Sequence, residues 1–307
     1  MTDAVQQTDR QRLADARRWV VKVGSALLTN DGRGLDASVV KMLADQLAAL
    51  RSGGCDVVLV SSGAIVAGLA RLNLAERPHE VHISQAAAAV GQSALVRAYE
   101  EHLGPHGVTT AQILLSHADV RARDRYLNAR STLSTLLAMN VLPIVNENDT
   151  VVTDEIRLGD NDTLAALVAN LVDADALLIL TDQDGLMDSD PRQSANAALI
   201  QTADVHDSSL DAIAGAGSAL GRGGMATKLS AARLAARSGT ATVIANGRLP
   251  DAITQVAGGA SLGTFLQTQR QPQSARKQWL ASLLHAQGSL VLDDGAVRGV
   301  SDQGRSL

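Results

Sequence analysis

The sequence predicts an α/β fold in which a mainly parallel sheet is covered by helices on both faces. Short, fully apolar runs alternate with segments of helical periodicity, and strands that are apolar throughout are typical of parallel sheets buried on both sides. Hydrophobic residues make up 46% of the 307 residues and charged residues 19%, which is enough for a large core. Because aromatic residues make up only 2%, that core is expected to be aliphatic.

The first half of the chain contains the clearest helix boundary signals. Asp36 is a suitable N-cap for a helix with apolar residues at helical spacing, and Gly53-Gly54 is a suitable end for it. Further helices are expected over residues 84–103 and 126–139. Strands are expected over residues 19–23, 57–60, 108–115 and 141–145.

The second half repeats this alternation. Helices are expected over residues 164–171 and 225–237, and strands over 176–180 and 240–245. A turn-rich piece follows the strand at 176–180, and a glycine-rich loop over 215–224 precedes the last of these helices.

Polar residues follow four of the expected strands at the point where each strand ends. These are Gly24-Ser25, Ser61 to Gly63, Asn146 to Asp149 and Thr181-Asp182. In open parallel sheets, ligands bind beyond the carboxyl ends of the strands. The sequence therefore predicts a ligand site at that edge of the sheet.

Two clusters of acids and amides lie close together in the chain. Asn146-Glu147-Asn148-Asp149 follows a strand, and Gly159-Asp160-Asn161-Asp162 precedes a helix. Asp and Asn are also ordinary caps and loop residues. Two such clusters flanking one connection favour a site that binds an ammonium group or a metal ion.

Two lysines are candidates for binding phosphate. Lys22 lies in an otherwise apolar strand, where a buried charge needs a partner, although a lysine on an edge strand could instead extend to water. Residues 221–228, GRGGMATK, open a helix and combine free backbone N–H groups with Lys228. The loop lacks the Gly-Lys-Ser/Thr order of a Walker A motif, and a plain glycine linker is the alternative.

The composition argues against several classes of protein. The net charge is −5 without a long basic run, so nonspecific binding of nucleic acid has no electrostatic support. The first 18 residues contain no apolar signal core, and no unbroken apolar run is long enough to span a membrane. The chain is therefore expected to be soluble. Its single cysteine, Cys55, cannot form an internal disulfide, so we expect a cytoplasmic protein.

We expect four segments along the chain. Residues 1–18 form a polar N-terminal tail and residues 19–266 the main domain, followed by a linker rich in Gln over 267–275. Residues 276–307 form a short appendage that is too small for a core of its own.

Six ordered segments carry a resemblance to a known family. They read WVVKVGSALLTN, VVLVSSGAIVAG, IVNENDTV, IRLGDNDTLAALVA, LLILTDQDGLMDSDPR and GRGGMATKLSAA. Together, over residues 19–265, they resemble the amino acid kinase family, and within it the bacterial members that phosphorylate glutamate. The resemblance implies a three-layer αβα sandwich. Residues 276–307 resemble the opening of a PUA domain and stop before that domain could close.

The resemblance also implies a reaction and a set of site residues. The reaction is transfer of the γ-phosphoryl group of ATP, with Mg²⁺, to the side-chain carboxylate of L-glutamate, which is the first step of proline synthesis. The residues implied to bind glutamate are Ser62, Gly63, Asp149 and Asn161. Those implied to act on the phosphoryl group are Lys22, Lys228 and Asp162, with Asp162 orienting the two lysines. Those implied to contact ATP are Lys22, Gly24, Ser25, Thr181, Asp182, Arg222, Gly223, Gly224, Met225, Ala226, Thr227 and Lys228.

Two positions depart from the family pattern. Arg222 stands where threonine or serine is usual, which could alter nucleotide affinity, and Leu158 replaces a phenylalanine before Gly159. The resemblance further implies a homodimer or homotetramer, feedback inhibition by proline, and coupling to the reductase that forms glutamate 5-semialdehyde. The open alternatives are a kinase of acetylglutamate or aspartate, and an amino-acid-binding regulator without catalysis. RNA binding through the PUA-like segment is disfavoured by the acidic balance.

Overall fold

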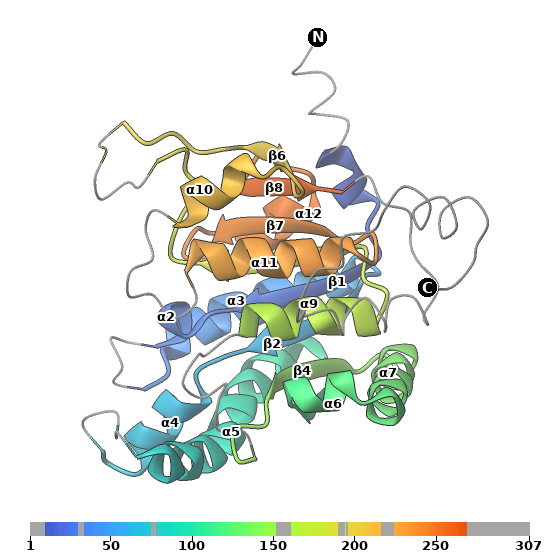
Figure 1. Ribbon diagram of the computed structural model, residues 1–307. Coiled ribbons are helices and arrows are strands. Elements are labelled where there is room, and N and C mark those ends of the chain that lie inside the picture. The colour runs from blue at the N-terminus through green and yellow to red at the C-terminus, as the bar shows by residue number, and fades with distance from the viewer. Residues whose placement is uncertain are drawn as a thin grey trace, which may run out of the picture.

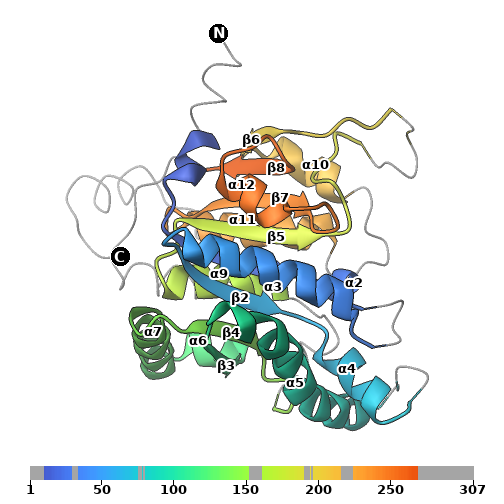
Figure 2. The same cartoon turned by 180° about the vertical axis from the view of Figure 1, so that it is seen from behind.

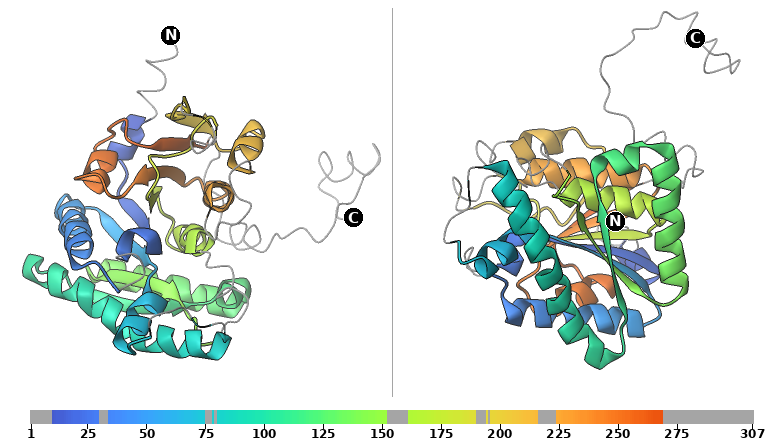
Figure 3. Two further views of the ribbon diagram at one scale, coloured as in Figure 1. Left: turned by 90° about the vertical axis from the view of Figure 1, so that its left-hand side faces the viewer. Right: turned by 90° about the horizontal axis from the view of Figure 1, so that it is seen from below.

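The computed structural model describes residues 10–29, 34–74, 78, 80–151, 161–189, 194, 196–215 and 224–268. Within these ranges the chain forms one eight-stranded sheet between two layers of helices (Figure 1). The end-on view in Figure 3 shows the sheet between the two layers. The predicted α/β sandwich is confirmed.

The sheet is parallel except at one pair of strands. Its order is β3-β4-β2-β1-β5-β7-β8-β6, and β7 and β8 are antiparallel. The bounds are β1 (Arg18–Val23), β2 (Asp56–Ser61), β3 (Thr110–Leu115), β4 (Leu142–Glu147), β5 (Ala176–Thr181), β6 (Thr202–Asp204), β7 (Ala241–Asn246) and β8 (Thr264–Gln267). The central β1 pairs with β2 on one side and with β5 on the other, so the direction of strand addition switches at β1. Such a switch point is the usual place for a ligand in this class of sheet.

The helices divide between the two faces. In the foreground of Figure 1 lie α6 (His117–Arg121), α7 (Arg123–Ala138), α9 (Asn161–Leu171), α10 (Ser209–Gly215) and α11 (Met225–Ala236). The opposite face, seen in Figure 2, carries α2 (Ser25–Leu28), α3 (Ala37–Ser52), α4 (Ala64–Arg71), α5 (Val81–Leu103) and α12 (Ala252–Ala257). A short 3₁₀ helix, η1 (Gly104–His106), extends α5.

The central strands are apolar throughout because both of their faces are covered. In β1, Val20 joins the core under α9 and α11, whereas Val21 joins the core under α3 and α5. Side chains alternate along a strand, so Lys22 lies on the same face as Val20 and is directed toward α9. The charged group of Lys22 therefore lies on the face of the sheet that α9 and α11 cover.

The local signals at α3 act as predicted. The Asp36 side chain accepts hydrogen bonds from the backbone N–H groups of Ser38 and Val39, and the helix ends at Gly53. The expected helices and strands are all present, with boundaries shifted by a few residues, as for α5, which begins at Val81 instead of Ser84. The short elements α2, α4, α6, α10, α12, β6 and β8 were not predicted, because few residues define their periodicity.

Helices α4 and α5 pack closely through small residues. A Cβ atom added at Gly68 would lie 1.7 Å from the carbonyl oxygen of Ala87, and one added at Gly91 would lie 1.7 Å from that of Ala64. Each helix therefore presents an alanine and a glycine four residues apart to the other. This contact fixes α5 against the segment that follows β2.

The N-terminal segment is packed in part against the main domain. Residues 10–14 are helical, and Arg10 and Leu13 are buried, although the sequence predicts a polar tail up to Arg18. Arg10 is held because its guanidinium donates to the backbone carbonyls of Ala260, Leu262, Gly263 and Gln201. An arginine within a polar stretch does not reveal such long-range partners before the chain folds.

Several predicted segments lie outside the described residues. They are residues 1–9, the connections 152–160 and 216–223, and residues 269–307, which hold most of the predicted linker and the PUA-like appendage. Across the part of the chain that is described, no helix is both long enough and apolar enough to cross a membrane.

Candidate active site

Two lysines from different elements meet one buried carboxylate. Lys22 comes from β1, Asp162 is the second residue of α9, and Lys228 lies in the first turns of α11. Lys22 Nζ lies 2.6 Å from Asp162 Oδ1, and Lys228 Nζ lies 3.0 Å from Asp162 Oδ2. The carboxylate therefore holds both ammonium groups, one on each oxygen.

The three charged side chains of this triad are almost completely buried, so their charges interact strongly. The Asp162 side chain is 1% exposed, and those of Lys22 and Lys228 are 8% and 7% exposed. Burial alone would raise the pKa of Asp162, but the charges and hydrogen bonds of the two lysines outweigh it and hold the pKa below its ordinary value. Two cations against one anion leave a net positive charge, which suits an anionic ligand.

The start of α11 adds donors beside the triad. Gly224 is the N-cap of this helix, and Thr227 Oγ1 donates to the carbonyl oxygen of Gly224 at 2.7 Å. Thr227 Oγ1 also lies 3.3 Å from Asp162 Oδ2. Met225 and Ala226 form the first turn, whose N–H groups and helix dipole favour an anion. Arg222 and Gly223 lie outside the described residues.

Gly24 and Ser25 lie at the end of β1, next to the triad. A Cβ atom built on Gly24 would be 3.5 Å from Lys22 Nζ, so the backbone here passes close to the ammonium group. Ser25 is exposed and opens α2. This backbone therefore lies beside an ammonium group that the sequence predicts to bind phosphate.

On the other side of Asp162, Asn161 joins three strand ends. Its Nδ2 donates to Ser62 Oγ at 2.8 Å, to Asn146 Oδ1 at 3.1 Å and to the carbonyl oxygen of Ser61 at 3.3 Å. Its Oδ1 is buried and meets no hydrogen-bond donor among the residues that the structure describes. A buried acceptor without a partner is costly, which makes this oxygen a candidate to accept from a ligand.

Two further predicted residues line the same edge. Gly63 has a φ of +99°, a conformation that side chains rarely adopt, and it turns the chain from β2 into α4. Asp149 is 8% exposed and lies in the turn after β4. A buried carboxylate and a buried amide oxygen can together bind an ammonium group.

Thr181 and Asp182 lie at the end of β5, the other neighbour of β1. Leu180 is in register with Val23, so Thr181 reaches the level of Gly24. Thr181 Oγ1 donates to Asp182 Oδ1 at 3.2 Å, and the Asp182 side chain is exposed. None of the hydrogen bonds within the described ranges joins this pair directly to the triad.

The structure adds polar residues that the sequence did not single out. Gln92 on α5 and Gln112 on β3 contact each other, and Gln92 also contacts Asn146. Tyr99 is fully buried with its hydroxyl 3.2 Å from Ser61 Oγ. The only signal in the sequence is a polar side chain on an otherwise apolar, alanine-rich face of α5, which does not distinguish a functional residue from a structural one.

The fold and the site define a class of protein. An αβα sandwich whose central strand carries a lysine, facing a carboxylate and a second lysine at a helix N-terminus, is suited to phosphoryl transfer between anions. The chain belongs to the amino acid kinase family, and the model of that family matches residues 17–246.

Two similar relatives are both glutamate 5-kinases. The chain is 59% identical over 302 residues to the glutamate 5-kinase of Chromohalobacter salexigens, covering 98% of this chain and 80% of the relative. It is 58% identical over 298 residues to the glutamate 5-kinase of Saccharophagus degradans, covering 97% of this chain and 80% of the relative. Among solved structures, UMP kinase from Bacillus anthracis aligns with a TM-score of 0.57 at 14% identity, covering 83% of this chain and 97% of that one, which supports the fold.

Proposed function

We propose that this protein phosphorylates the side-chain carboxylate of L-glutamate with ATP, giving L-glutamyl 5-phosphate, the first step of proline biosynthesis. The observation that carries the proposal is the Lys22–Asp162–Lys228 triad at the carboxyl ends of the central strands. The identity to the glutamate 5-kinases named above supports the choice of substrate.

The chemistry requires positive charge more than it requires a base. A glutamate side chain has a pKa of about 4.3, so the nucleophile is already an anion at neutral pH. The obstacle is repulsion between this carboxylate and the phosphates of ATP. Lys22 and Lys228 relieve it, and Asp162 keeps both lysines charged and aimed because each of its oxygens holds one ammonium group.

The two substrates occupy opposite sides of the triad in this proposal. Glutamate lies toward β2 and β4, with its ammonium group on Asp149 and Asn161 and with Ser62 and Gly63 beneath it. ATP lies toward β5 and α11, against Thr181, Asp182 and the segment 222–228, with Gly24 and Ser25 near the transferring phosphoryl group. This arrangement brings the carboxylate and the γ-phosphorus together between the lysines.

Mg²⁺ is expected to arrive on the phosphates of ATP. Both oxygens of Asp162 hold lysines, and the described residues contain no group of three His, Cys, Asp or Glu side chains that could hold a metal ion. When bound, the ion supplies further charge neutralisation at the β- and γ-phosphates.

Further parts of the proposal concern assembly and regulation. We infer a cytoplasmic homodimer or homotetramer that is inhibited by proline at or near the glutamate site, and that passes its product to the reductase forming glutamate 5-semialdehyde. An acyl phosphate hydrolyses readily in water, which favours such coupling. Residues 19–266 form the kinase domain in this proposal, and residues 276–307 begin a PUA-like one.

One assay tests the reaction. ATP consumption is measured with L-glutamate, N-acetylglutamate or L-aspartate as acceptor, and hydroxylamine is added to trap the acyl phosphate as a hydroxamate. Hydroxamate with glutamate alone is the expected result. ATP turnover with another acceptor only, or with none, contradicts the proposal. Adding proline tests the regulation separately, because unchanged glutamate kinetics would remove the feedback role and leave the reaction intact.

A further inference from the structure

A row of side-chain amides connects α5 to the proposed glutamate site. Gln92 on α5 is 6% exposed, and its Oε1 accepts from Asn146 Nδ2 at 3.3 Å and from Gln112 Nε2 at 3.4 Å. Asn146 Oδ1 in turn accepts from Asn161 Nδ2 at 3.1 Å. The row thus runs from Gln92 through Asn146 to Asn161.

Backbone groups fix which way each amide faces. Gln92 Nε2 donates to the carbonyl oxygen of Glu147 at 3.2 Å, so its Oε1 must face Asn146. Asn146 Oδ1 accepts from the backbone N–H of Glu147 at 2.8 Å, so the Nδ2 of Asn146 must face Gln92. Because a backbone N–H cannot accept and a carbonyl cannot donate, neither amide can flip without losing a bond.

We propose that Gln92 is a positioning residue of the amino acid subsite and acts through Asn146 on Asn161. With its Nδ2 held by Asn146, Ser62 and Ser61, Asn161 has its buried Oδ1 left to accept from the ammonium group of the substrate. This inference rests on the proposed function and extends it by naming what sets the orientation of the ammonium acceptor. Gln92 itself does not touch the substrate in this scheme.

The packing of α5 explains why Gln92 reaches the row. The preceding residue, Gly91, lies against the carbonyl oxygen of Ala64, where a larger residue would not fit. The close approach of α5 to α4 therefore brings the next side chain to the end of β4. Gln92 and the turn at Gly63 are positioned by the same contact between helices.

The test replaces Gln92 by a side chain of similar length that cannot hydrogen-bond. In Gln92→Met, all three hydrogen bonds of the side chain are lost, and we expect the KM for glutamate to rise roughly 3- to 10-fold, as if substrate binding had lost one neutral hydrogen bond, while the KM for ATP changes less than about twofold. Glutarate, which has both carboxylates but no ammonium group, serves as the second probe. Its inhibition constant should change less than the KM for glutamate, because the row acts on the ammonium acceptor.

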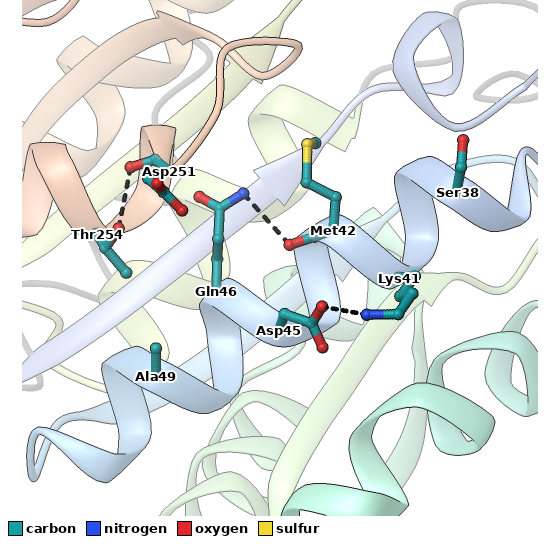
Figure 4. Close-up of a pocket in the computed structure, with 8 residues that line it drawn as sticks. All are labelled: Ser38, Lys41, Met42, Asp45, Gln46, Ala49, Asp251 and Thr254. Atoms are coloured by element: carbon teal, nitrogen blue, oxygen red, sulfur yellow. Dashed lines mark hydrogen bonds and ion pairs between the residues drawn. The ribbon is translucent and has the colours of Figure 1, made fainter.

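A matched control is available in Gln46, another buried glutamine. It lies on α3 beside a pocket of about 330 Å³ between α3 and α12 (Figure 4). Its Oε1 accepts from the backbone N–H of Ile253 at 2.8 Å, so Gln46→Met also removes a buried hydrogen bond. We expect this variant to lose stability without a change in the KM for glutamate.

The outcomes separate the inference from the proposed function. A wild-type protein without glutamate-dependent ATP turnover would overturn both. An active wild type with an unchanged KM for glutamate in Gln92→Met, or with equal changes for glutamate, ATP and glutarate, would overturn the positioning role alone. If Gln92→Met does not fold, the same measurements on Gln92→Leu, which also removes both the acceptor and the donor, decide by the same criteria.

Discussion

At the scale of single residues, the properties of the proposed active site follow from one carboxylate between two lysines. Lys228 Nζ is held by Asp162 Oδ2 and lies in the first turns of α11. Because its charge is needed most when negative charge passes between the substrates, we expect Lys228→Ala to lower kcat by at least about 100-fold. The KM for glutamate should change far less. Steady-state kinetics with both substrates varied provide the measurement.

A surface lysine provides the control for this prediction. Lys41 is exposed and pairs with Asp45 one turn away at 2.6 Å. Lys41→Ala is expected to leave kcat and both KM values unchanged, since the pair is solvated and α3 packs on the opposite face of the sheet from α9 and α11. Near-normal turnover in Lys228→Ala would remove this lysine from the transition state.

The same triad predicts how stability depends on pH. In Asp162→Asn, two buried ammonium groups lose their counter-charge, so we expect the free energy of unfolding at pH 7 to fall by about 3 kcal/mol. The folded-state pKa of Asp162 lies below its unfolded value of about 3.9. The stabilisation is therefore fully present above that value and is lost as the pH falls through the folded pKa. Urea unfolding at a series of pH values should show the gap between the two proteins narrowing below about pH 4.

Asp45 offers a comparison for the buried carboxylate. Its side chain is 40% exposed and interacts with Lys41 and His106, so Asp45→Asn is expected to cost less than about 1 kcal/mol. If Asp162→Asn were no more destabilising than Asp45→Asn, or if the gap widened on acidification, the triad would not be the buried ionic cluster described above.

At the scale of elements, the sequence predicts those helices and strands whose signals lie within a few neighbouring residues. The capped helix α3 and the apolar strands β1, β2 and β5 follow from residues within a few positions, as do the polar ends of those strands. The antiparallel pairing of β8 depends on where a short strand finds an open edge, which no local pattern encodes. Contacts through glycine, as between α4 and α5, look in the sequence like ordinary helix interruptions.

Some residues of the candidate site can be recognised from the local sequence, and others cannot. Lys22 and the loop before Lys228 stand out as charges in unusual places, whereas the roles of Asp162 and Asn161 came from the resemblance to a family. Gln92 was missed because its partners, Asn146 and the backbone of Glu147, are more than 50 positions away in the chain. Side-chain networks between distant elements exist only once the fold brings them together.

The contact between α4 and α5 leads to a prediction at this scale. In Gly91→Ala, the new methyl group would lie 1.7 Å from the carbonyl oxygen of Ala64 and 2.6 Å from the backbone nitrogen of Gly68. The helices must separate, so we expect a loss of about 2 kcal/mol in unfolding free energy. The KM for glutamate should also rise, because α4 follows directly on Ser62 and Gly63. Urea unfolding and glutamate kinetics on the same variant measure both effects.

Gly104 is the matched glycine. It ends α5 in a right-handed helical conformation, and a Cβ atom there would meet no other heavy atom within 4 Å. Gly104→Ala is expected to leave the KM for glutamate unchanged and to be neutral or slightly stabilising, by up to about 1 kcal/mol. Equal stability for the two alanine variants would contradict the packing argument.

At the scale of the whole molecule, Arg10 joins the two ends of the described chain. Its guanidinium is buried and donates to the carbonyls of Gln201, Ala260, Leu262 and Gly263, and it lies 5.9 Å from the centre of the Phe265 ring. Burial lowers the pKa of Arg10, which reflects the cost of desolvating this charge. The hydrogen bonds from the guanidinium to the four carbonyl oxygens offset that cost.

The last prediction concerns this contact. In Arg10→Met, several buried carbonyl oxygens lose their donor, so we expect the unfolding free energy to fall by about 3 kcal/mol. Arg10→Lys should not restore it, because a single ammonium group cannot reach acceptors arranged for a planar guanidinium. Arg71, which is exposed on α4, gives the control, with an expected change below about 0.5 kcal/mol for Arg71→Met. Because Arg10 contacts none of the proposed substrate residues that the structure describes, kcat per folded molecule should stay unchanged in both Arg10 variants. Full stability in Arg10→Lys would mean that one charge, and not the set of carbonyl contacts, ties the N-terminal segment to the end of the sheet.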